Sequence, residues 1–343
     1  MKIYSLLKIN NTIKSHRVKF LGLWLLDLLD QRYLGLYMDP VMACNLRCKM
    51  CYFTDQNYVK TVMKGMMKED DIEFLAKINF KNALKLQIGC GAEPTLFKHN
   101  LKLIETAKKY KVPYISMVTN GNLLSEEDVF NFSFSGLNEF ILSLHGVHKS
   151  SYEDFMDKGD YQKFHEVLQY ITKEKKRNPK LVLRINYTFN KDNFMELADF
   201  FDVFGQYSID VIQLRPIDKI GETQYNDFSL TEIETAYEKL ISALKREAVQ
   251  RNITFLYPES IKRDPKVSQV VETNNNSSFL MPYTYCYISP SYFWKPDFDW
   301  KNESFSSWKK RNRWRLQLLK NVFISRKHLE VSDRNMLNYS VER

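Results

Sequence analysis

The chain has 343 residues, of which 44% are hydrophobic and 27% charged, and its net charge is +9. This composition is typical of a globular protein with a sizeable core, and it excludes a disordered, collagen-like or low-complexity chain. Five cysteines in so long a chain exclude a small disulfide-stapled scaffold.

The first predicted element is an apolar helix over Phe20–Leu29, which follows a run of basic residues between positions 14 and 19. The apolar segment Phe20–Leu29 is too short to cross a bilayer and contains Asp27, so we expect a helix that docks on the core. It starts too late for a signal peptide and lacks a small-residue cleavage site, and we therefore expect a cytoplasmic protein. Peripheral membrane contact is the alternative for this helix, because cations flank its apolar residues.

From residue 34 to residue 250, apolar β-rich runs alternate with helical patterns. The expected strands are Leu34–Asp39, Ala83–Gly89, Tyr114–Thr119, Glu139–Leu144, Leu181–Phe189 and Ser208–Leu214. The expected helices are Lys68–Ile78, Asn100–Tyr110, one that begins at Ser125, Tyr161–Lys175, Asn193–Phe204 and Thr231–Gln250. Such alternation is typical of βαβ units around a mainly parallel sheet. We predict an α/β fold, a partial (β/α)6 TIM-like barrel, whose chemistry lies at the carboxyl ends of the strands.

The amino-acid composition of the chain changes after residue 250. Residues 265–278 are polar and typical of a surface loop, whereas residues 281–300 are dense in aromatic residues and proline. We expect an N-terminal helical segment over 1–33, the barrel over 34–260, and a small irregular C-terminal extension with a basic tail over 261–343. The last 43 residues hold eleven Lys or Arg against four Asp or Glu, and we expect a solvated tail there rather than a nucleic-acid site.

Three of the five cysteines follow the first predicted strand closely. Cys44, Cys48 and Cys51 form a C-x3-C-x2-C motif on one loop. Four thiolates would saturate a [4Fe–4S] cluster, whereas three leave one iron open for an external ligand, as in a catalytic centre. The alternative is a structural zinc site with Cys90, Cys286 or a histidine as the fourth ligand.

This cysteine motif resembles the signature of the radical S-adenosylmethionine (SAM) superfamily. The resemblance implies one [4Fe–4S] cluster whose metal ligands and catalytic residues are Cys44, Cys48 and Cys51. It also implies that the cluster binds SAM and cleaves it reductively to a 5′-deoxyadenosyl radical, which abstracts hydrogen from a substrate.

Further segments resemble motifs of the same family, and each follows a predicted strand. Gly91-Ala-Glu-Pro94 is similar to the Gly-Gly-Glu-Pro segment, with Ala92 in place of the second glycine. Thr119-Asn-Gly121 matches the Thr-Asn-Gly turn, and Ser143-Leu-His-Gly146 resembles a Ser-Leu-Asp-Gly segment. The SAM contacts that the resemblance implies are Met50, Gly91, Ala92, Glu93, Pro94, Asn120, Ser143 and Asn186.

The C-terminal part resembles the start of the cluster-binding extension called SPASM, or of its shorter relative called twitch. Cys286 is followed by a segment at 295–300 that is similar to the Pro-x-Gly-Asp turn of such extensions. No cysteine follows Cys286 in the chain, and one thiol cannot hold a second cluster. We therefore expect a degenerate or truncated extension.

The sequence as a whole predicts a radical SAM enzyme, an oxidoreductase or modifying enzyme, that acts on a peptide, protein or sugar. An electron donor such as flavodoxin or ferredoxin is the expected partner, and nucleic acid is not. The alternative is a non-catalytic iron–sulfur or zinc binding protein, an inactive paralogue or partner, which the degenerate extension favours.

Overall fold

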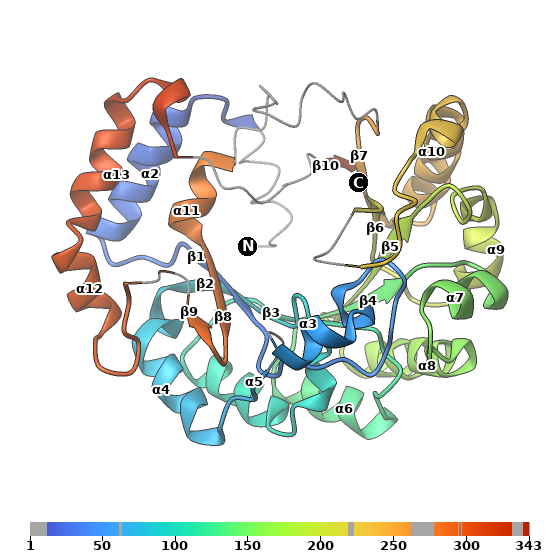
Figure 1. Ribbon diagram of the computed structural model, residues 1–343, viewed down its shortest axis with the longest axis horizontal. Coiled ribbons are helices and arrows are strands. Elements are labelled where there is room, and N and C mark those ends of the chain that lie inside the picture. The colour runs from blue at the N-terminus through green and yellow to red at the C-terminus, as the bar shows by residue number, and fades with distance from the viewer. Residues whose placement is uncertain are drawn as a thin grey trace.

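The computed structural model of the protein describes residues 12–61, 64–218, 223–261, 278–293, 295 and 297–330, and the backbone of 339–342. Within this part of the chain, ten strands form one sheet that curves into an open barrel with helices on its outer side (Figure 1). The strands are β1 Leu34–Met38, β2 Ala83–Ile88, β3 Ile115–Thr119, β4 Glu139–Leu144, β5 Val182–Phe189, β6 Val211–Pro216, β7 Thr254–Pro258, β8 Tyr285–Ser289, β9 Tyr292–Phe293 and β10 Tyr339–Glu342. The helices are α2 His16–Leu28, α3 Gln56–Thr61, α4 Glu69–Asn79, α5 Asn100–Lys109, α6 Glu126–Ser135, α7 Lys149–Phe155, α8 Tyr161–Arg177, α9 Phe200–Phe204, α10 Glu234–Gln250, α11 Met281–Thr284, α12 Phe305–Arg311 and α13 Trp314–Phe323.

Parallel pairing builds most of the sheet. Strands β1 to β7 are neighbours in chain order and pair in parallel, and β8 adds in parallel on the other side of β1. The strands β9 and β10 pair antiparallel at the two edges, and the described strands do not close into a full barrel. The predicted α/β partial barrel is confirmed, and each of the six predicted strands is present within three residues of its expected bounds.

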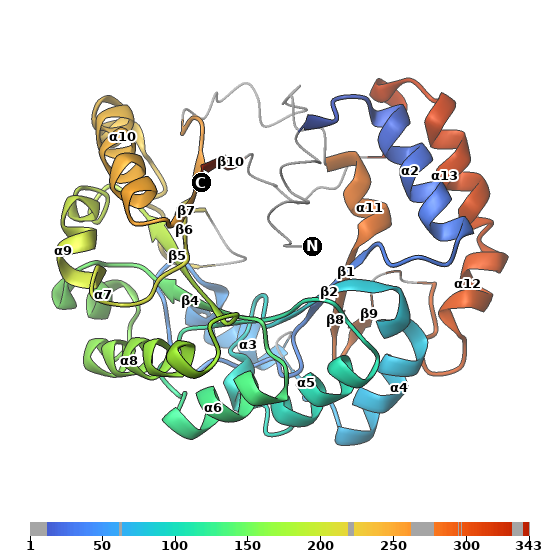
Figure 2. The same cartoon turned by 180° about the vertical axis from the view of Figure 1, so that it is seen from behind.

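Side chains alternate between the two faces of the sheet along each strand, so the outer face is apolar and the inner face mixes charged, polar and apolar residues. Helices cover the outer side of the sheet (Figure 2). Leu36, Leu86 and Leu142 lie on this outer face, are fully buried, and belong to the hydrophobic core. On the inner face, Arg184 of β5 binds Glu139 of β4 at 2.7 Å and Gln213 of β6 at 3.1 Å. A full TIM barrel usually fills its interior with branched apolar side chains. The inner face of this sheet carries charged and polar side chains beside apolar ones, which is suited to a ligand.

Local sequence explains where the helices start. The Ser125 side chain accepts a hydrogen bond from the backbone N–H of Asp128 at 3.0 Å, which confirms the predicted start of α6. The helix expected over Asn193–Phe204 is replaced by a 3-10 segment over Met195–Asp199 and the short α9. Its start is delayed because the side chains of Asn190 and Asn193 bond to each other's backbone N–H groups.

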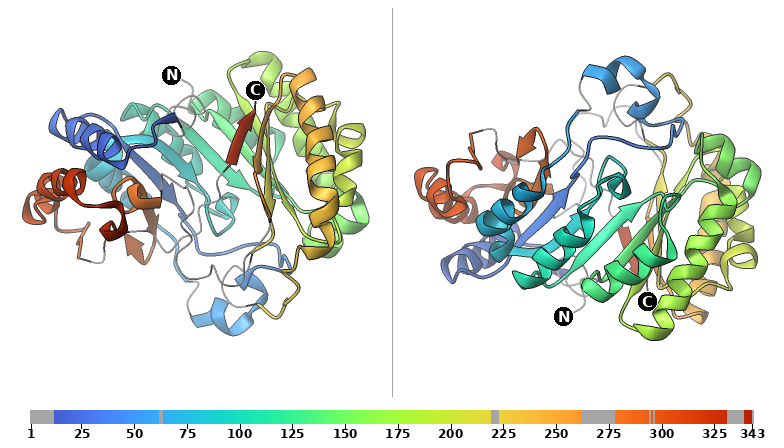
Figure 3. Two further views of the ribbon diagram at one scale, coloured as in Figure 1. Left: turned by 90° about the horizontal axis from the view of Figure 1, so that it is seen from above. Right: turned by 90° about the horizontal axis from the view of Figure 1, so that it is seen from below.

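The C-terminal segment is more ordered than its charge suggests, and the expected solvated tail is wrong for residues 305–330. Helices α12 and α13 pack beside α2 (Figure 3). The buried carboxylate of Asp27 on α2 accepts hydrogen bonds from Lys309 at 2.7 Å and from Arg315 at 2.9 Å. Buried Trp308 and Trp314 supply the apolar contact, so aromatic packing outweighs the repulsion of like charges.

Two further expectations concern the ends of the chain. Helix α2 docks on the core as predicted, with Phe20 and Leu23 buried. Among the described residues, no helix combines the length and the apolar character needed to cross a lipid bilayer. The domain boundaries at 33/34 and 260/261, and the likeness of the extension to SPASM or twitch, stay predictions.

Candidate active site

The three clustered cysteines lie on the loop between β1 and a 3-10 turn over Tyr52–Thr54, at the carboxyl end of β1. Backbone hydrogen bonds fix this cysteine loop (residues 44–51) against α7 and the turn that follows it. The N–H of Arg47 donates to the carbonyl of Asp157 at 2.9 Å, and the N–H of Lys49 donates to that of Phe155 at 3.0 Å. These hydrogen bonds tie the cysteine loop to α7 and to the turn after it.

All three thiols are free and half-buried. Burial raises the pKa of each thiol, that of Cys44 to about 12, and the thiols of Cys51 and Cys44 raise the pKa of Cys48 further. Burial thus favours the protonated thiols, and a metal that binds them must displace their protons.

The three thiols on one loop offer a set of sulfur ligands for a metal centre. Within the described residues, no three His, Cys, Asp or Glu side chains lie close enough together to hold one metal ion. A structural zinc ion needs four ligands at bonding distance. In a [4Fe–4S] cluster each thiolate binds a different iron, so the sulfur atoms stand further apart. Three free thiols on one loop fit such a cluster and leave one iron for an external ligand.

The turn after β2 lies very close to its neighbours, and a glycine is required at position 89. Gly89 has a φ of +83°, and a Cβ there would lie 2.3 Å from the carbonyl oxygen of Val118. A Cβ at Gly91 would lie 2.6 Å from the hydroxyl of Tyr52, which donates a hydrogen bond to the Gly91 carbonyl. Ala92 is not among the residues with a positive φ, so the alanine fits this turn without backbone strain.

Asp39, directly after β1, fixes the turn after β2 through hydrogen bonds. Its carboxylate is 1% exposed and accepts the N–H of Cys90 at 2.7 Å and the N–H of Gly91 at 3.0 Å. The hydroxyl of Tyr287, on β8, donates to the same carboxylate at 2.7 Å. Burial raises the pKa of Asp39, and these hydrogen bonds oppose the rise. Sequence reasoning missed both residues, although an acid at the end of an apolar strand is a usable signal for Asp39.

Glu93 joins the turn after β2 to the turn after β3. One carboxylate oxygen accepts the hydroxyls of Thr95 and Thr119, each at 2.6 Å, and the other accepts the N–H of Asn120 at 2.9 Å. Burial raises the pKa of Glu93, and these hydrogen bonds oppose the rise. Both oxygens are engaged inside the protein, so Glu93 positions the two turns relative to each other.

The remaining residues predicted to contact SAM differ in whether their side chains are already engaged within the protein. Asn120 reaches back to the cysteine loop, where its amide donates to the side chain of Asn45 at 2.8 Å. Ser143 and Asn186 are paired neighbours on β4 and β5, and the buried amide oxygen of Asn186 has no hydrogen-bond partner in the described part of the protein. Met50 is 6% exposed and belongs to the hydrophobic core, which favours packing over ligand contact.

The structure gathers the predicted positions at one rim of the barrel. They follow β1, β2 and β3 or lie near the ends of β4 and β5, five strands that are consecutive in the sheet. Cys90 is exposed beside Asp39, and Cys286 is buried within β8. The roles of the three clustered cysteines and of the eight implied SAM contacts stay predictions.

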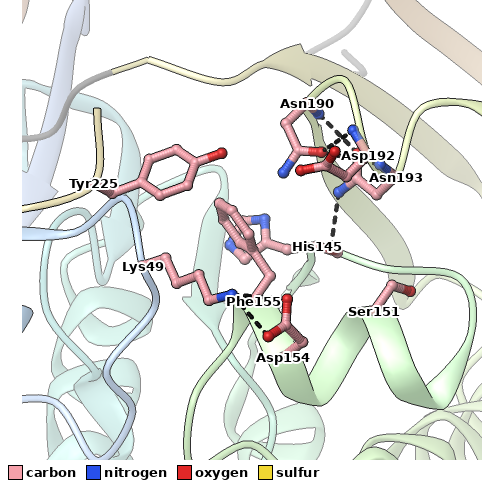
Figure 4. A pocket seen from close by; sticks show the side chains of 9 residues that line it. All are labelled: Lys49, His145, Ser151, Asp154, Phe155, Asn190, Asp192, Asn193 and Tyr225. Carbon is pink, nitrogen blue, oxygen red and sulfur yellow. Dashed lines mark hydrogen bonds and ion pairs between the residues drawn. The ribbon is translucent and has the colours of Figure 1, made fainter. Parts of the chain in front are cut away.

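A small pocket opens at the same rim, between the cysteine loop, α7 and the segment after β5 (Figure 4). It is lined by Lys49, His145, Ser151, Asp154, Phe155, Asn190, Asp192, Asn193 and Tyr225. Lys49 pairs with Asp154 at 2.7 Å. Within the described residues, Nδ1 of His145 and the hydroxyl of Tyr225 are buried without a hydrogen-bond partner. The pocket therefore offers two unsatisfied polar atoms to a water molecule or to a small polar group.

The buried His145 makes stability depend on pH. Burial, and after it the charge of Arg215, lowers the pKa of His145 to about 4, whereas the unfolded chain protonates this residue near 6.5. As the pH falls from about 6.5 to about 4, the unfolded state gains a proton that the folded state does not. The free energy of unfolding should therefore fall by about 3 kcal/mol across this window.

Urea denaturation at about pH 7 and about pH 4 measures this effect. His145→Gln cannot titrate, so its loss of stability between the two pH values should be smaller than that of the wild type. Parallel losses in the two proteins would show that His145 titrates normally.

The site region matches a known family. Residues 38–202 match the model of the Radical SAM superfamily. This range contains all three cysteines and all eight positions that the sequence implied as SAM contacts.

Curated relatives and solved structures extend the comparison. The chain is 25% identical over 195 residues to the "Probable GTP 3',8-cyclase" of Sulfolobus acidocaldarius, which covers 56% of this chain and 59% of that protein. It is 26% identical over 277 residues to the protein of the same name from Pyrococcus horikoshii. This match covers 76% of this chain and 82% of that protein. SuiB of Streptococcus suis bound to S-adenosylmethionine superposes with a TM-score of 0.55 at 17% identity, over 80% of this chain and 62% of that chain. The anSMEcpe structure with bound AdoMet and the Cp18Cys peptide superposes with a TM-score of 0.51 at 19% identity. This superposition covers 64% of this chain and 62% of that chain.

The matches cover only part of the length of some of these proteins. The chain spans about three fifths of the length of the Sulfolobus protein and of SuiB. At such low identities the two solved structures show a shared fold.

Proposed function

Because residues 38–202 form a radical SAM domain, we propose that the protein is an enzyme that binds a [4Fe–4S] cluster through Cys44, Cys48 and Cys51 and binds SAM beside it. When bound, these groups supply one-electron cleavage of SAM and abstraction of a hydrogen atom from a substrate. The observation that carries the proposal is the convergence of three free thiols and the turns after β2 and β3 on one rim of the barrel.

In this proposal the protein's own residues hold, position and cover the bound groups. Asp39 and Glu93 fix the turns after β2 and β3 through buried hydrogen bonds. Asn186 offers an unsatisfied amide oxygen to a hydroxyl or an amino group of a ligand. Tyr52 and the buried Phe53 pack against each other directly after Cys51, with ring centroids 4.9 Å apart, and exclude water from that side of the cysteine loop.

We propose that the substrate enters the interior of the barrel. Lys85, Arg184 and Arg215 lie on the inner face of the sheet, and Glu139 is the one acidic residue within strands β1 to β7. This excess of cations favours an anionic substrate. A nucleoside triphosphate is such a substrate, which agrees with the name of the curated relatives. A peptide, protein or sugar is the alternative, and the peptide in the anSMEcpe structure supports it by likeness of fold alone.

Anaerobic reconstitution with iron and sulfide tests the enzymatic proposal. We expect about four iron atoms per chain, and we expect dithionite with SAM to release methionine and 5′-deoxyadenosine. Release of neither product from the reconstituted protein would favour the non-catalytic iron–sulfur or zinc protein instead. Faster release of 5′-deoxyadenosine on addition of GTP would support the anionic substrate, whereas no response to GTP would count against a nucleotide and leave SAM cleavage intact.

A further inference from the structure

Helix α2 exposes an apolar stripe on the side that faces away from the protein. Five aliphatic side chains form it, each at least 42% exposed: Val18, Leu21, Leu25, Leu28 and Leu29. Val18, Leu21, Leu25 and Leu28 follow one another at intervals of three or four residues, and Leu29, the C-cap residue, lies four residues after Leu25, so the five share one face. The opposite face, with Phe20 and Leu23, is buried against the core. Leaving this many neighbouring aliphatic side chains in water is unfavourable, which marks the stripe as a contact surface.

Helices α12 and α13, beside α2, are basic. Residues 305–323, which contain both helices, hold six Lys or Arg and no Asp or Glu. Lys309 and Arg315 pair with Asp27, and Arg311 pairs with Asp297 and Glu303, so the charge left over comes from the other three cations. Helix α2 itself holds Arg17 and Lys19 against Asp27. Because Asp27 is buried and already bound by Lys309 and Arg315, its charge does not face a partner of the stripe.

Cations also gather at the N-terminal end of the stripe. Lys14, in the segment just before α2, and Arg17, on the same side of the helix as Val18 and Leu21, are both exposed. Neither forms an ion pair with any described residue. Burial, and after it the nearby charges of Lys14 and Arg326, lowers the pKa of Lys19 to about 8. The positive potential of the unpaired N–H groups at the start of α2 adds to these charges.

We propose that the α2 face, defined as Lys14, Arg17 and the five residues of the stripe, binds peripherally to an anionic lipid surface. Aliphatic residues along one face of a helix with a basic rim are the pattern of a helix that lies in the membrane interface. The aliphatic side chains enter the boundary of the acyl chains, and the cations contact the lipid phosphates.

The charge distinguishes this occupant from a second copy of the chain. Two copies joined through the α2 face would bring their basic α12 and α13 regions together, and like charges oppose such contact. An anionic bilayer instead neutralises the same cations. The proposal is independent of the enzymatic function, because the α2 face contains none of the proposed cluster or SAM ligands.

Co-sedimentation of the full-length protein with vesicles tests the proposal. The probes are vesicles of phosphatidylcholine alone and vesicles of phosphatidylcholine with about one third phosphatidylglycerol. The variants are Leu21→Gln/Leu25→Gln, which removes apolar contact, and Lys14→Glu/Arg17→Glu, which reverses the charge. Val249→Gln on α10 is the matched control, because Val249 is 44% exposed and Leu25 is 43% exposed.

We expect the wild type and Val249→Gln to sediment with the anionic vesicles and to be released by high salt. Both α2 variants should bind these vesicles at least about tenfold more weakly while melting at the wild-type temperature, since the changed side chains are exposed. Equal binding of the wild type and Leu21→Gln/Leu25→Gln, or equal binding to neutral and anionic vesicles, would overturn the proposal. A lipid-free dimer that Leu21→Gln/Leu25→Gln dissociates would overturn it as well and would assign the face to a second copy.

Discussion

Replacing Cys48 with alanine is expected to reduce SAM cleavage to background. Cys48 is the middle ligand of the proposed trio, and Cys90 and Cys286 lie elsewhere, so no described cysteine stands ready to replace it. Even changes to groups that only support metal ligands lower metal affinity by about 10–100-fold, and loss of a direct ligand should cost more. Iron content after reconstitution and release of 5′-deoxyadenosine measure the effect.

Cys90→Ala is the matched control for this experiment. Cys90 is an exposed thiol in the turn after β2, and the Asp39 carboxylate binds its backbone N–H, which alanine retains. We expect Cys90→Ala to keep its iron and to cleave SAM. Cluster loss in Cys90→Ala with retention in Cys48→Ala would mean that the ligand set is assigned wrongly.

Replacing Asp39 with alanine is expected to weaken both the fold and SAM binding. The change leaves the N–H groups of Cys90 and Gly91 and the hydroxyl of Tyr287 without their acceptor in a buried place. Buried donors that lose their partner cost about 1–3 kcal/mol each, and partial access of water lowers the sum, so the free energy of unfolding should fall by about 2–4 kcal/mol. The freed turn should also bind SAM about tenfold more weakly, because ordering it again costs conformational entropy.

Calorimetric titration with S-adenosylhomocysteine measures the binding without cleavage. Tyr287→Phe separates positioning from folding, because it removes one hydrogen bond to Asp39, worth about 1 kcal/mol, and keeps the ring. We expect weaker binding in Tyr287→Phe and unchanged binding in Tyr292→Phe, whose ring lies 6.0 Å from that of Tyr287. If Tyr287→Phe binds the ligand as tightly as the wild type, Asp39 acts on stability alone.

The sequence predicted the barrel strands well because their signals are local. Apolar β-rich runs and helical periodicity depend on neighbouring residues, so β1 to β6 appeared within three residues of their expected bounds. The helix expected at Asn193 failed because two asparagine side chains compete for the backbone over a short range. The C-terminal helices were misjudged because net charge was weighed above the spacing of Trp308, Trp314 and Leu318.

What the sequence by itself determined is the cysteine trio, the order of the turns and the strands that they follow. A motif is a local arrangement of residues, and parallel strands necessarily bring their carboxyl ends to one rim. What only the tertiary structure decided is how that rim is held. Tyr287 meets Asp39 across 248 residues, and Trp314 meets Tyr33 across 281, since strand β8 and helix α13 return to the start of the chain. Contacts between such distant residues arise from the folded topology, and no local pattern in the sequence specifies them.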